Sequence, residues 1–414
     1  MEPTKVRRVL ILAFAASIVL LGSSIALGQE AGGDLGGGAG IFRPKNPETS
    51  SKRRVRNSGS HGRSTNPRSN GRPAAEVAAE VEDLLDEGNE ARDSKKFVNA
   101  EKAYKSAIRL NGRDWRAPYG IGNVYTDQQR WEEAEQAYRQ SAGFNSSNVD
   151  TYIALSYVLL QPRSGGSQAK RFADAEAAAR RAILLQENSA LAYDRLGAAL
   201  EARGLPVADT EQAYRKSIEI EPQFAVAYVH LARLIRKDPK RAIEAEPLYG
   251  KALDLAKDAP TLVLIGDALQ SEQRYKDSEK PLKAALDLDA NNPSALFLLG
   301  RMYVVLKQYA DAEPYLQKAI EVSPRSFEPY QVLGSAYLRE DRLADAEEVF
   351  GKATSVAPAS GRKQLAGSYG FGGVGDGYAT AGKTRDAVRA YQAALKLDPQ
   401  NPEIQKKLAD ISAH

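Results

Sequence analysis

The residues whose types and spacing most directly suggest chemistry run from Gly377 to Thr384. They satisfy the pattern Gly-x-x-x-x-Gly-Lys-Thr, in which loop amides and a lysine side chain bind the phosphates of a nucleotide. That chemistry needs a strand before the loop, whereas Gly382-Lys383 occupies a turn between two expected helices. Gly370 to Gly375 match a dinucleotide-binding fingerprint, again without the strand–helix–strand unit that gives it meaning. We therefore predict that neither stretch binds a cofactor.

Candidate metal ligands and nucleophiles are scarce in the rest of the chain. No cysteine is present, which excludes disulfides and thiolate metal sites. The three histidines, His61, His230 and His414, are far apart in sequence and suggest no ligand pair. No pattern assembles a nucleophile, a base and oxyanion donors. We predict no catalytic residues, no metal site and no enzymatic activity.

The formal net charge of +4 is unevenly distributed. Residues 1–30 carry three basic and two acidic side chains, and residues 31–73 carry nine basic and two acidic ones, a net +7. The remainder carries 45 basic and 49 acidic side chains, a net −4. The basic character therefore belongs to one short segment and not to the body of the protein.

The first 28 residues have the organisation of an export signal. Three basic residues precede an apolar run from Val9 to Leu21, and small residues follow up to Gly28. The run is shorter than the roughly 20 residues that a membrane-spanning helix needs. We predict a signal peptide over residues 1–28 that is cleaved on export to the periplasm or the cell exterior. The alternative is an uncleaved anchor in the inner membrane, and only then would the protein be held at a membrane.

Residues 29–80 form a region of different composition. Glycine dominates its start, and Arg, Ser, Asn and Pro follow with few apolar residues. Such a region cannot bury enough apolar surface to offset its ordering entropy, so we predict a disordered linker. Its densest charge cluster, residues 52–56, is either part of a plain linker or a contact to an anionic surface. No aromatic residues alternate with the basic ones, which argues against specific nucleic-acid binding.

The long body of the chain repeats one pattern. From Pro293 to Pro324, apolar and small residues recur at spacings of three and four in two bursts, separated by the polar turn Lys307-Gln308. This spacing places each burst on one face of a helix. Gly300 and Ala312 carry no bulky side chain, so the two helices can approach closely. The stretch predicts a helix–turn–helix hairpin whose apolar face needs neighbouring hairpins to cover it.

The pattern recurs with a period close to 34 residues. Small residues equivalent to Ala312 fall at Ala100, Ala134, Ala175, Thr210, Ala245, Ser278, Ala346 and Ala387. With Leu333-Gly334, Tyr337, Ala346, Phe350, Ala353 and Pro358, the chain closely resembles the tetratricopeptide repeat family. The resemblance implies an all-α, right-handed superhelical solenoid of about nine helix–turn–helix repeats.

Nine repeats cover residues 81–401, and residues 402–414 are expected to form a capping helix. The glycines between Gly370 and Gly377 weaken the first helix of the ninth repeat, which we expect to be frayed or mobile.

The resemblance also implies where a partner would bind. In this family the first helices of successive repeats line a concave groove, and set positions of each repeat point into it. On this sequence these positions form a first zone of Asn89, Tyr119 and Asn123, a basic zone of Arg195, His230, Arg233, Arg236 and Lys237, and an apolar zone of Val263, Asp267, Phe297, Leu298, Arg301 and Leu338. The basic zone would attract an acidic segment. The apolar zone would hold a peptide or a helix, or else serve packing between repeats of the superhelix or a dimer contact.

These observations predict an exported, non-catalytic scaffold that binds a partner protein or peptide in the concave groove. The alternative is a membrane-anchored component of an envelope machine for secretion, pilus or surface-polymer assembly. The family's clamp for chaperone tails needs lysines where Leu85 and Tyr119 stand, so we do not expect that ligand.

Overall fold

The computed structural model of the chain describes residues 43–49, 73–163 and 166–412. Within these ranges all the regular secondary structure is helical, which confirms the all-α fold class. The predicted signal peptide, residues 1–28, and the basic cluster, residues 52–56, lie outside the described residues.

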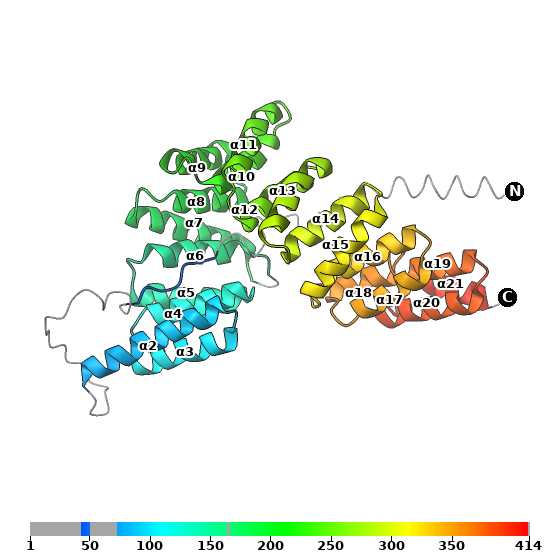
Figure 1. The fold of residues 1–414 in the computed structure, drawn as a ribbon, viewed down its shortest axis with the longest axis horizontal. Helices are drawn as coiled ribbons and strands as arrows, with labels where there is room; N and C mark the ends of the chain where they lie inside the picture. The colour runs from blue at the N-terminus through cyan, green and yellow to red at the C-terminus, as the bar shows by residue number, and fades with distance from the viewer. Residues whose placement is uncertain (1–42, 50–72, 164–165, 413–414) are drawn as a thin grey trace. The chain divides into compact units, whose positions relative to one another are not determined.

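In the part of the chain that the structure describes, the helices form nine consecutive hairpins, as the repeat pattern predicts (Figure 1). Each hairpin has a first and a second helix: α2 (Ala74–Asp93) and α3 (Phe97–Leu110), α4 (Arg116–Asp127) and α5 (Trp131–Phe144), α6 (Val149–Leu160) and α7 (Gln168–Leu185), α8 (Ala190–Ala202) and α9 (Val207–Ile220), α10 (Ala225–Arg236) and α11 (Ala242–Leu255), α12 (Ala259–Ser271) and α13 (Tyr275–Leu288), α14 (Pro293–Val305) and α15 (Tyr309–Val322), α16 (Phe327–Arg339) and α17 (Leu343–Ala353), and α19 (Phe371–Thr380) and α20 (Thr384–Leu397). Helix α18 (Ala359–Ala366) precedes the last hairpin, and α21 (Pro402–Ser412) follows it.

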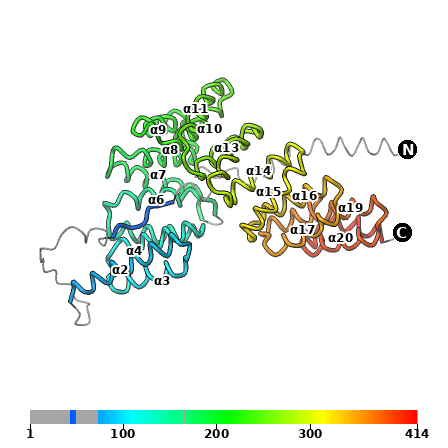
Figure 2. The backbone as a smooth tube through the Cα atoms, in the orientation of Figure 1, coloured from blue at the N-terminus to red at the C-terminus, as the bar shows by residue number. Residues whose placement is uncertain are grey.

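The chain divides into two compact units, Met1–Leu248 and Tyr249–His414, and the boundary between them falls inside α11. Within each unit, most helices pack against their neighbours in sequence, and their order can be followed along the tube in Figure 2. First helices of adjacent repeats also meet, α2 with α4 in the first unit and α12 with α14 in the second. Packing of each hairpin mainly on its neighbours is the organisation of a helical-repeat solenoid.

Most hairpins contain a close approach between a glycine of the first helix and a large side chain of the second. A Cβ atom added to Gly122 would lie 2.6 Å from the ring of Tyr138, and one added to Gly334 would lie 2.3 Å from the ring of Phe350. The same arrangement occurs for Gly88 with Tyr104, Gly197 with Tyr214, Gly266 with Leu282, Gly300 with Leu316, and Gly375 with Tyr391. The predicted close approach at Gly300 is thus confirmed, and it recurs along the chain.

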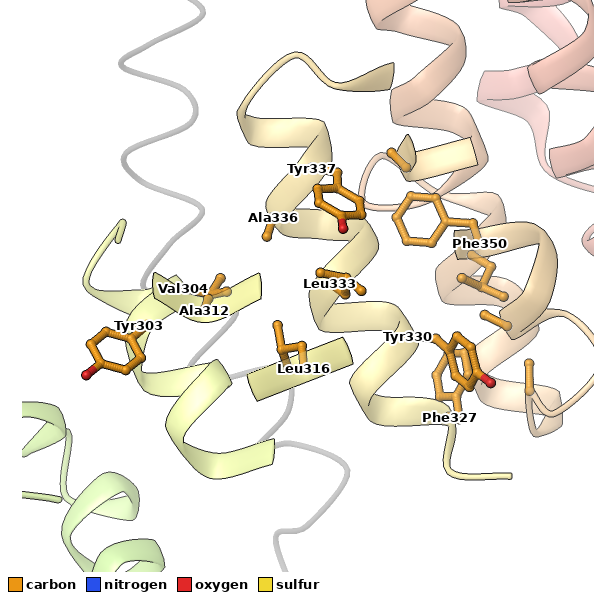
Figure 3. Close-up of a cluster of buried hydrophobic side chains, with 14 of the residues drawn as sticks. Tyr303, Val304, Ala312, Leu316, Phe327, Tyr330, Leu333, Ala336, Tyr337 and Phe350 are labelled. Carbon is orange, nitrogen blue, oxygen red and sulfur yellow. The ribbon is translucent and has the colours of Figure 1, made fainter. Parts of the chain in front are cut away.

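The large side chains that enter these gaps form the core. In the second unit Leu316 and Phe350 are fully buried, and Leu333 and Tyr337 pack in the same cluster (Figure 3). Full burial of one such side chain stabilises the fold by about 1.5–3 kcal/mol. Each repeat therefore contributes its own layer of side chains to the core of its unit.

The turns inside the hairpins use residues in the left-handed region. Lys307 has a φ of 62° and Gly382 a φ of 72°. The amide of Lys383 donates to the carbonyl oxygen of Tyr378 at 2.9 Å, which closes the turn after α19. Gly382-Lys383 is therefore an inter-helix turn, as predicted, and a helix precedes it where a phosphate-binding loop needs a strand.

The predicted linker, residues 29–80, is ordered in two places. Residues 43–49 lie against α2 and α4, and α2 begins at Ala74. The early start of α2 follows from the sequence Ala-Ala-Glu-Val-Ala-Ala-Glu, because these residues are mostly strong helix formers. The prediction of a linker was based on the average composition of residues 29–80, which does not reveal residues 43–49 or the start of α2.

The glycine-rich helix α19 is formed over Phe371–Thr380. A Cβ atom at Gly373 would lie 2.1 Å from the carbonyl oxygen of Ser368, and one at Gly370 would lie 2.1 Å from that of Leu365. These glycines let the connection from α18 pack directly on the helix. The expected mobility of this helix stays a prediction.

Two glycines of the same hairpin test the packing account. We expect Gly334→Ala to lower the free energy of unfolding by about 1–3 kcal/mol, because the added methyl group overpacks Phe350. No atom lies within 4 Å of a Cβ added to Gly351. Because alanine favours the helix over glycine, Gly351→Ala should raise the free energy of unfolding by about 0.5–1 kcal/mol. Urea unfolding followed by circular dichroism measures both changes. Equal stability of the two variants would contradict the account.

Candidate functional site

A non-helical segment of the chain lies on the first two repeats. Residues 43–49, Arg-Pro-Lys-Asn-Pro-Glu-Thr, form neither helix nor strand and appear as the isolated blue stretch in Figures 1 and 2. The side chains that bind them come from α2, α4 and the residues at their ends. We call this set the α2/α4 face: Asp86, Asn89, Arg92, Asp93, Arg116, Asn123 and Asp127.

Two asparagines at equivalent positions of successive first helices hold the main chain of the segment. The Asn123 side-chain amide donates to the carbonyl oxygen of Lys45 at 2.8 Å. The Asn89 amide donates to the carbonyl oxygen of Pro47 at 3.1 Å. The segment therefore lies across both first helices, and it runs from their C-terminal ends, at Arg92 and Asp127, towards Arg116 at the start of α4.

Each asparagine is oriented by a tyrosine of the second helix. Tyr104 donates to Asn89 Oδ1 at 2.7 Å, and Tyr138 donates to Asn123 Oδ1 at 2.9 Å. Because the carboxamide oxygen accepts these bonds, the NH2 group is directed to the other side, where the segment lies. Burial raises the pKa of both tyrosines well above its ordinary value, so both hydroxyls stay protonated donors.

Arg92 is the most buried charged group of the α2/α4 face, with 1% of its surface exposed. Its Nε and Nη2 atoms donate to the two carboxylate oxygens of Asp127 at 2.7 and 2.9 Å. Its Nη1 atom donates to the carbonyl oxygen of Pro44 and to Asn46 Oδ1, both at 2.8 Å. Burial lowers the pKa of Arg92, but the hydrogen bond and charge of Asp127 outweigh it and leave the pKa raised. A buried guanidinium needs acceptors for its donors, and the segment supplies two of them.

Further polar contacts bind both ends of the segment. At its start, Arg43 pairs with Asp93 at 3.0 Å and with Asp127 at 3.4 Å. The Asn46 amide also donates to Asp93, at 3.0 Å. At its end, Arg116 donates to the Glu48 carbonyl oxygen at 3.2 Å, and the Thr49 hydroxyl donates to Asp86 at 2.5 Å. The segment is thus bound along its whole described length.

The segment is recognised mainly through prolines and main-chain carbonyl groups. Pro44 and Pro47 are buried, whereas Lys45 and Glu48 have exposed side chains and offer their carbonyl oxygens to the face. Proline has no N–H to donate, so a face that binds carbonyl oxygens tolerates it without loss. Its restricted backbone also reduces the entropy lost on binding.

The structure places the predicted first zone partly on this face. Asn89 and Asn123 are members of it, whereas Tyr119 is buried in the core, with its ring 5.8 Å from that of Tyr138. Sequence reasoning missed Arg92, Arg116 and the three aspartates. A usable signal was the pair of opposite charges at Arg92 and Asp127, close to one repeat apart at the ends of successive first helices.

In the predicted basic zone, most cations have carboxylate partners within the chain. Arg195 and His230 are buried around Asp194, whose carboxylate oxygens lie 2.9 Å from Arg195 Nη2 and 2.7 Å from His230 Nδ1. Burial raises the pKa of Asp194, but the charges of His230 and Arg195 outweigh it, so the pKa is lowered.

On α10 and the residue after it, Arg236 pairs with Glu246 at 2.7 Å and Lys237 with Glu201 at 2.6 Å, while Arg233 is half-buried. The expectation of an acidic partner segment gains no support from this zone.

The predicted apolar zone of the second unit is largely used in packing. Val263 and Leu298 are buried in the core, and Phe297 and Leu338 are partly buried against it. Arg301 lies 3.5 Å from Asp267 and packs over the Phe297 ring. These contacts agree with the alternative that this zone serves packing between repeats.

Two other kinds of feature, metal sites and membrane-spanning helices, are absent from the described residues. These residues contain no group of three or more side chains suited to hold a metal ion. None of their helices combines the length and the apolar character needed to cross a bilayer.

Comparisons with known proteins agree with the architecture. A family model described as tetratricopeptide repeat matches residues 85–148, 263–329 and 307–361, and one described as TPR repeat matches residues 375–412. Among solved structures, yeast Tom70 is 14% identical, with 94% of this chain and 75% of that chain covered and a TM-score of 0.55, which shows a shared fold.

Two further solved structures match parts of the chain. YrrB, described as a TPR protein with an unusual peptide-binding site, is 24% identical, with 48% of this chain and 98% of that chain covered and a TM-score of 0.37. A tetratricopeptide repeat protein from Parabacteroides merdae is 14% identical, with 62% of this chain and 98% of that chain covered and a TM-score of 0.45. No curated protein matches the chain.

The buried pair of Arg92 and Asp127 yields a stability prediction. We expect Arg92→Gln to lower the free energy of unfolding by about 3 kcal/mol or more, because Asp127 loses both of its hydrogen bonds from the guanidinium. The control is Lys105→Gln, which breaks a surface ion pair with Glu101. This variant should change the free energy of unfolding by less than about 0.5 kcal/mol. Urea unfolding measures both, and similar losses would contradict the central role of Arg92.

Proposed function

The chain belongs to the tetratricopeptide repeat family, whose members are typically non-enzymatic interaction scaffolds, and from this premise we propose that it binds a non-helical segment of another protein. The binding site is the α2/α4 face. The first helices of the first two repeats supply side-chain donors, and the partner supplies main-chain carbonyl oxygens.

The observation that carries this proposal is the pair of bonds from Asn89 and Asn123 to the carbonyl groups of Pro47 and Lys45. Main-chain carbonyl groups are present in every protein, so an external segment can take the same two bonds. Each such bond contributes about 0.5–1.5 kcal/mol net. Useful affinity therefore requires several of them together with buried prolines.

We also propose that the scaffold acts outside the cytoplasm. Support for this comes from the basic, apolar and small-residue regions of residues 1–28. A mature protein that starts at Gln29 is the expected result of N-terminal sequencing. An intact start would favour the anchored envelope component as the alternative.

Selection from a random peptide library tests this binding, because the library samples many candidate segments at once. Residues 43–49 use the same two asparagines, so the comparison is made with Pro44→Gly and Pro47→Gly present in both forms. We expect the selected peptides to bind the double variant Asn89→Ala and Asn123→Ala about 5- to 150-fold more weakly than its parent, since two bonds together contribute about 1–3 kcal/mol. Fluorescence anisotropy measures the dissociation constants.

The matched control is Asn99→Ala on α3, where the asparagine is exposed and belongs to a second helix. This variant should bind like the wild type. Selected peptides that bind the double variant unchanged would rule out the α2/α4 face as the binding site.

A further inference from the structure

We infer that residues 43–49 are the resident occupant of the α2/α4 face in the free protein, so that a partner segment must displace them. The inference rests on the function proposed for this face. It also specifies the class of ligand: a non-helical segment with two prolines three residues apart, a basic residue before the first and a carboxamide before the second.

The specified class follows from which side chains of the segment are used. Arg43 pairs with Asp93, and Asn46 both accepts from Arg92 and donates to Asp93. Pro44 and Pro47 are buried. The side chains that follow each proline, Lys45 and Glu48, are exposed, so these positions are expected to accept other residues.

The α2/α4 face is built to be occupied. Arg92 is 1% exposed, and two of its hydrogen bonds end on the segment. The amides of Asn89 and Asn123 also donate to it. Departure of the segment exchanges these hydrogen bonds for bonds to water at a net loss, and a competing ligand that presents equivalent oxygens avoids this loss.

Charge also favours the chain's own segment. Helix α2 carries eight acidic residues and one basic residue, a net −7, whereas residues 31–73 carry a net +7. The acidic helix therefore offers the basic region a partner within the same chain. Because salt screens such attraction, high ionic strength should weaken the occupancy.

Covalent connection gives the segment a further advantage over a free peptide. Residues 50–73 join it to the start of α2, and a short tether raises the effective concentration of a ligand to roughly millimolar. A segment with a dissociation constant of about 100 μM would then fill the face about nine times in ten. A free competitor would show an apparent affinity reduced about tenfold.

The test measures binding of one synthetic peptide to full-length variants. The probe is a fluorescent peptide with the sequence of residues 43–49. The release variant, Pro44→Gly with Pro47→Gly, removes both buried rings and leaves the α2/α4 face unchanged. The matched control, Lys45→Gly with Glu48→Gly, places the same number of glycines where only main-chain groups are bound.

We expect the release variant to bind the probe at least about tenfold more tightly than the wild type, with the control close to the wild type. Adding Asn123→Ala to the release variant should reverse the gain. Circular dichroism verifies that the helices of each variant are retained.

Other outcomes overturn the inference in distinguishable ways. Equal, measurable binding to the wild type and the release variant would exclude occupancy and leave the proposed function intact. A dimer of the wild type in sedimentation, absent from the release variant, would assign the occupant to a second copy of the chain. Probe binding to neither form, while library peptides still bind the face, would exclude this ligand class. Failure of both the probe and the library would exclude the proposed function as well.

Discussion

The structure depends on one repeated contact, in which a large side chain of the second helix enters the gap left by a glycine of the first. The ring of Tyr104 lies so close to Gly88 that even a methyl group there would meet it at 2.5 Å. In the first two repeats this contact also prepares recognition. The glycines are followed directly by Asn89 and Asn123, and the hydroxyl of the inserted tyrosine binds the asparagine's oxygen. The same tyrosine therefore packs the hairpin and orients the asparagine that binds the segment.

The same contact explains why recognition of this kind is confined to certain repeats. In the eighth repeat Phe350 enters the gap and has no hydroxyl to orient a neighbour. In the ninth, Tyr391 donates to Asp376 at 2.7 Å, and Lys407 of α21 lies 2.9 Å from that carboxylate. A carboxylate accepts hydrogen bonds and cannot donate to a carbonyl oxygen at neutral pH. The residue after the glycine is therefore an amide donor in the first two repeats and a carboxylate acceptor in the ninth.

Sequence periodicity predicted the structural features that are determined by residue spacing within one repeat. The hairpins, the close approach at Gly300 and the turn at Gly382 follow from local patterns. The position of Asn123 in its repeat predicted a groove residue, and its side chain lies on the α2/α4 face. Contacts between repeats were harder to predict. The pairing of Arg92 with Asp127 and of Lys237 with Glu201 joins residues about one repeat apart, and helical periodicity does not report such pairs. Residues 43–49 were missed because they bind a face formed by two helices, α2 and α4, that lie well beyond them in the sequence.

A face that binds carbonyl oxygens has little means of choosing among sequences, since every peptide has them. Its selectivity must come from elsewhere, and the resident segment supplies a source. Any ligand competes against a tethered occupant that fills both proline positions and satisfies Arg92. Segments that offer main-chain oxygens alone lose this competition, because the tether gives the occupant an effective concentration of roughly millimolar. Only ligands that also match the prolines and the charges around Arg43 can displace it, so the occupant converts a permissive face into a selective one.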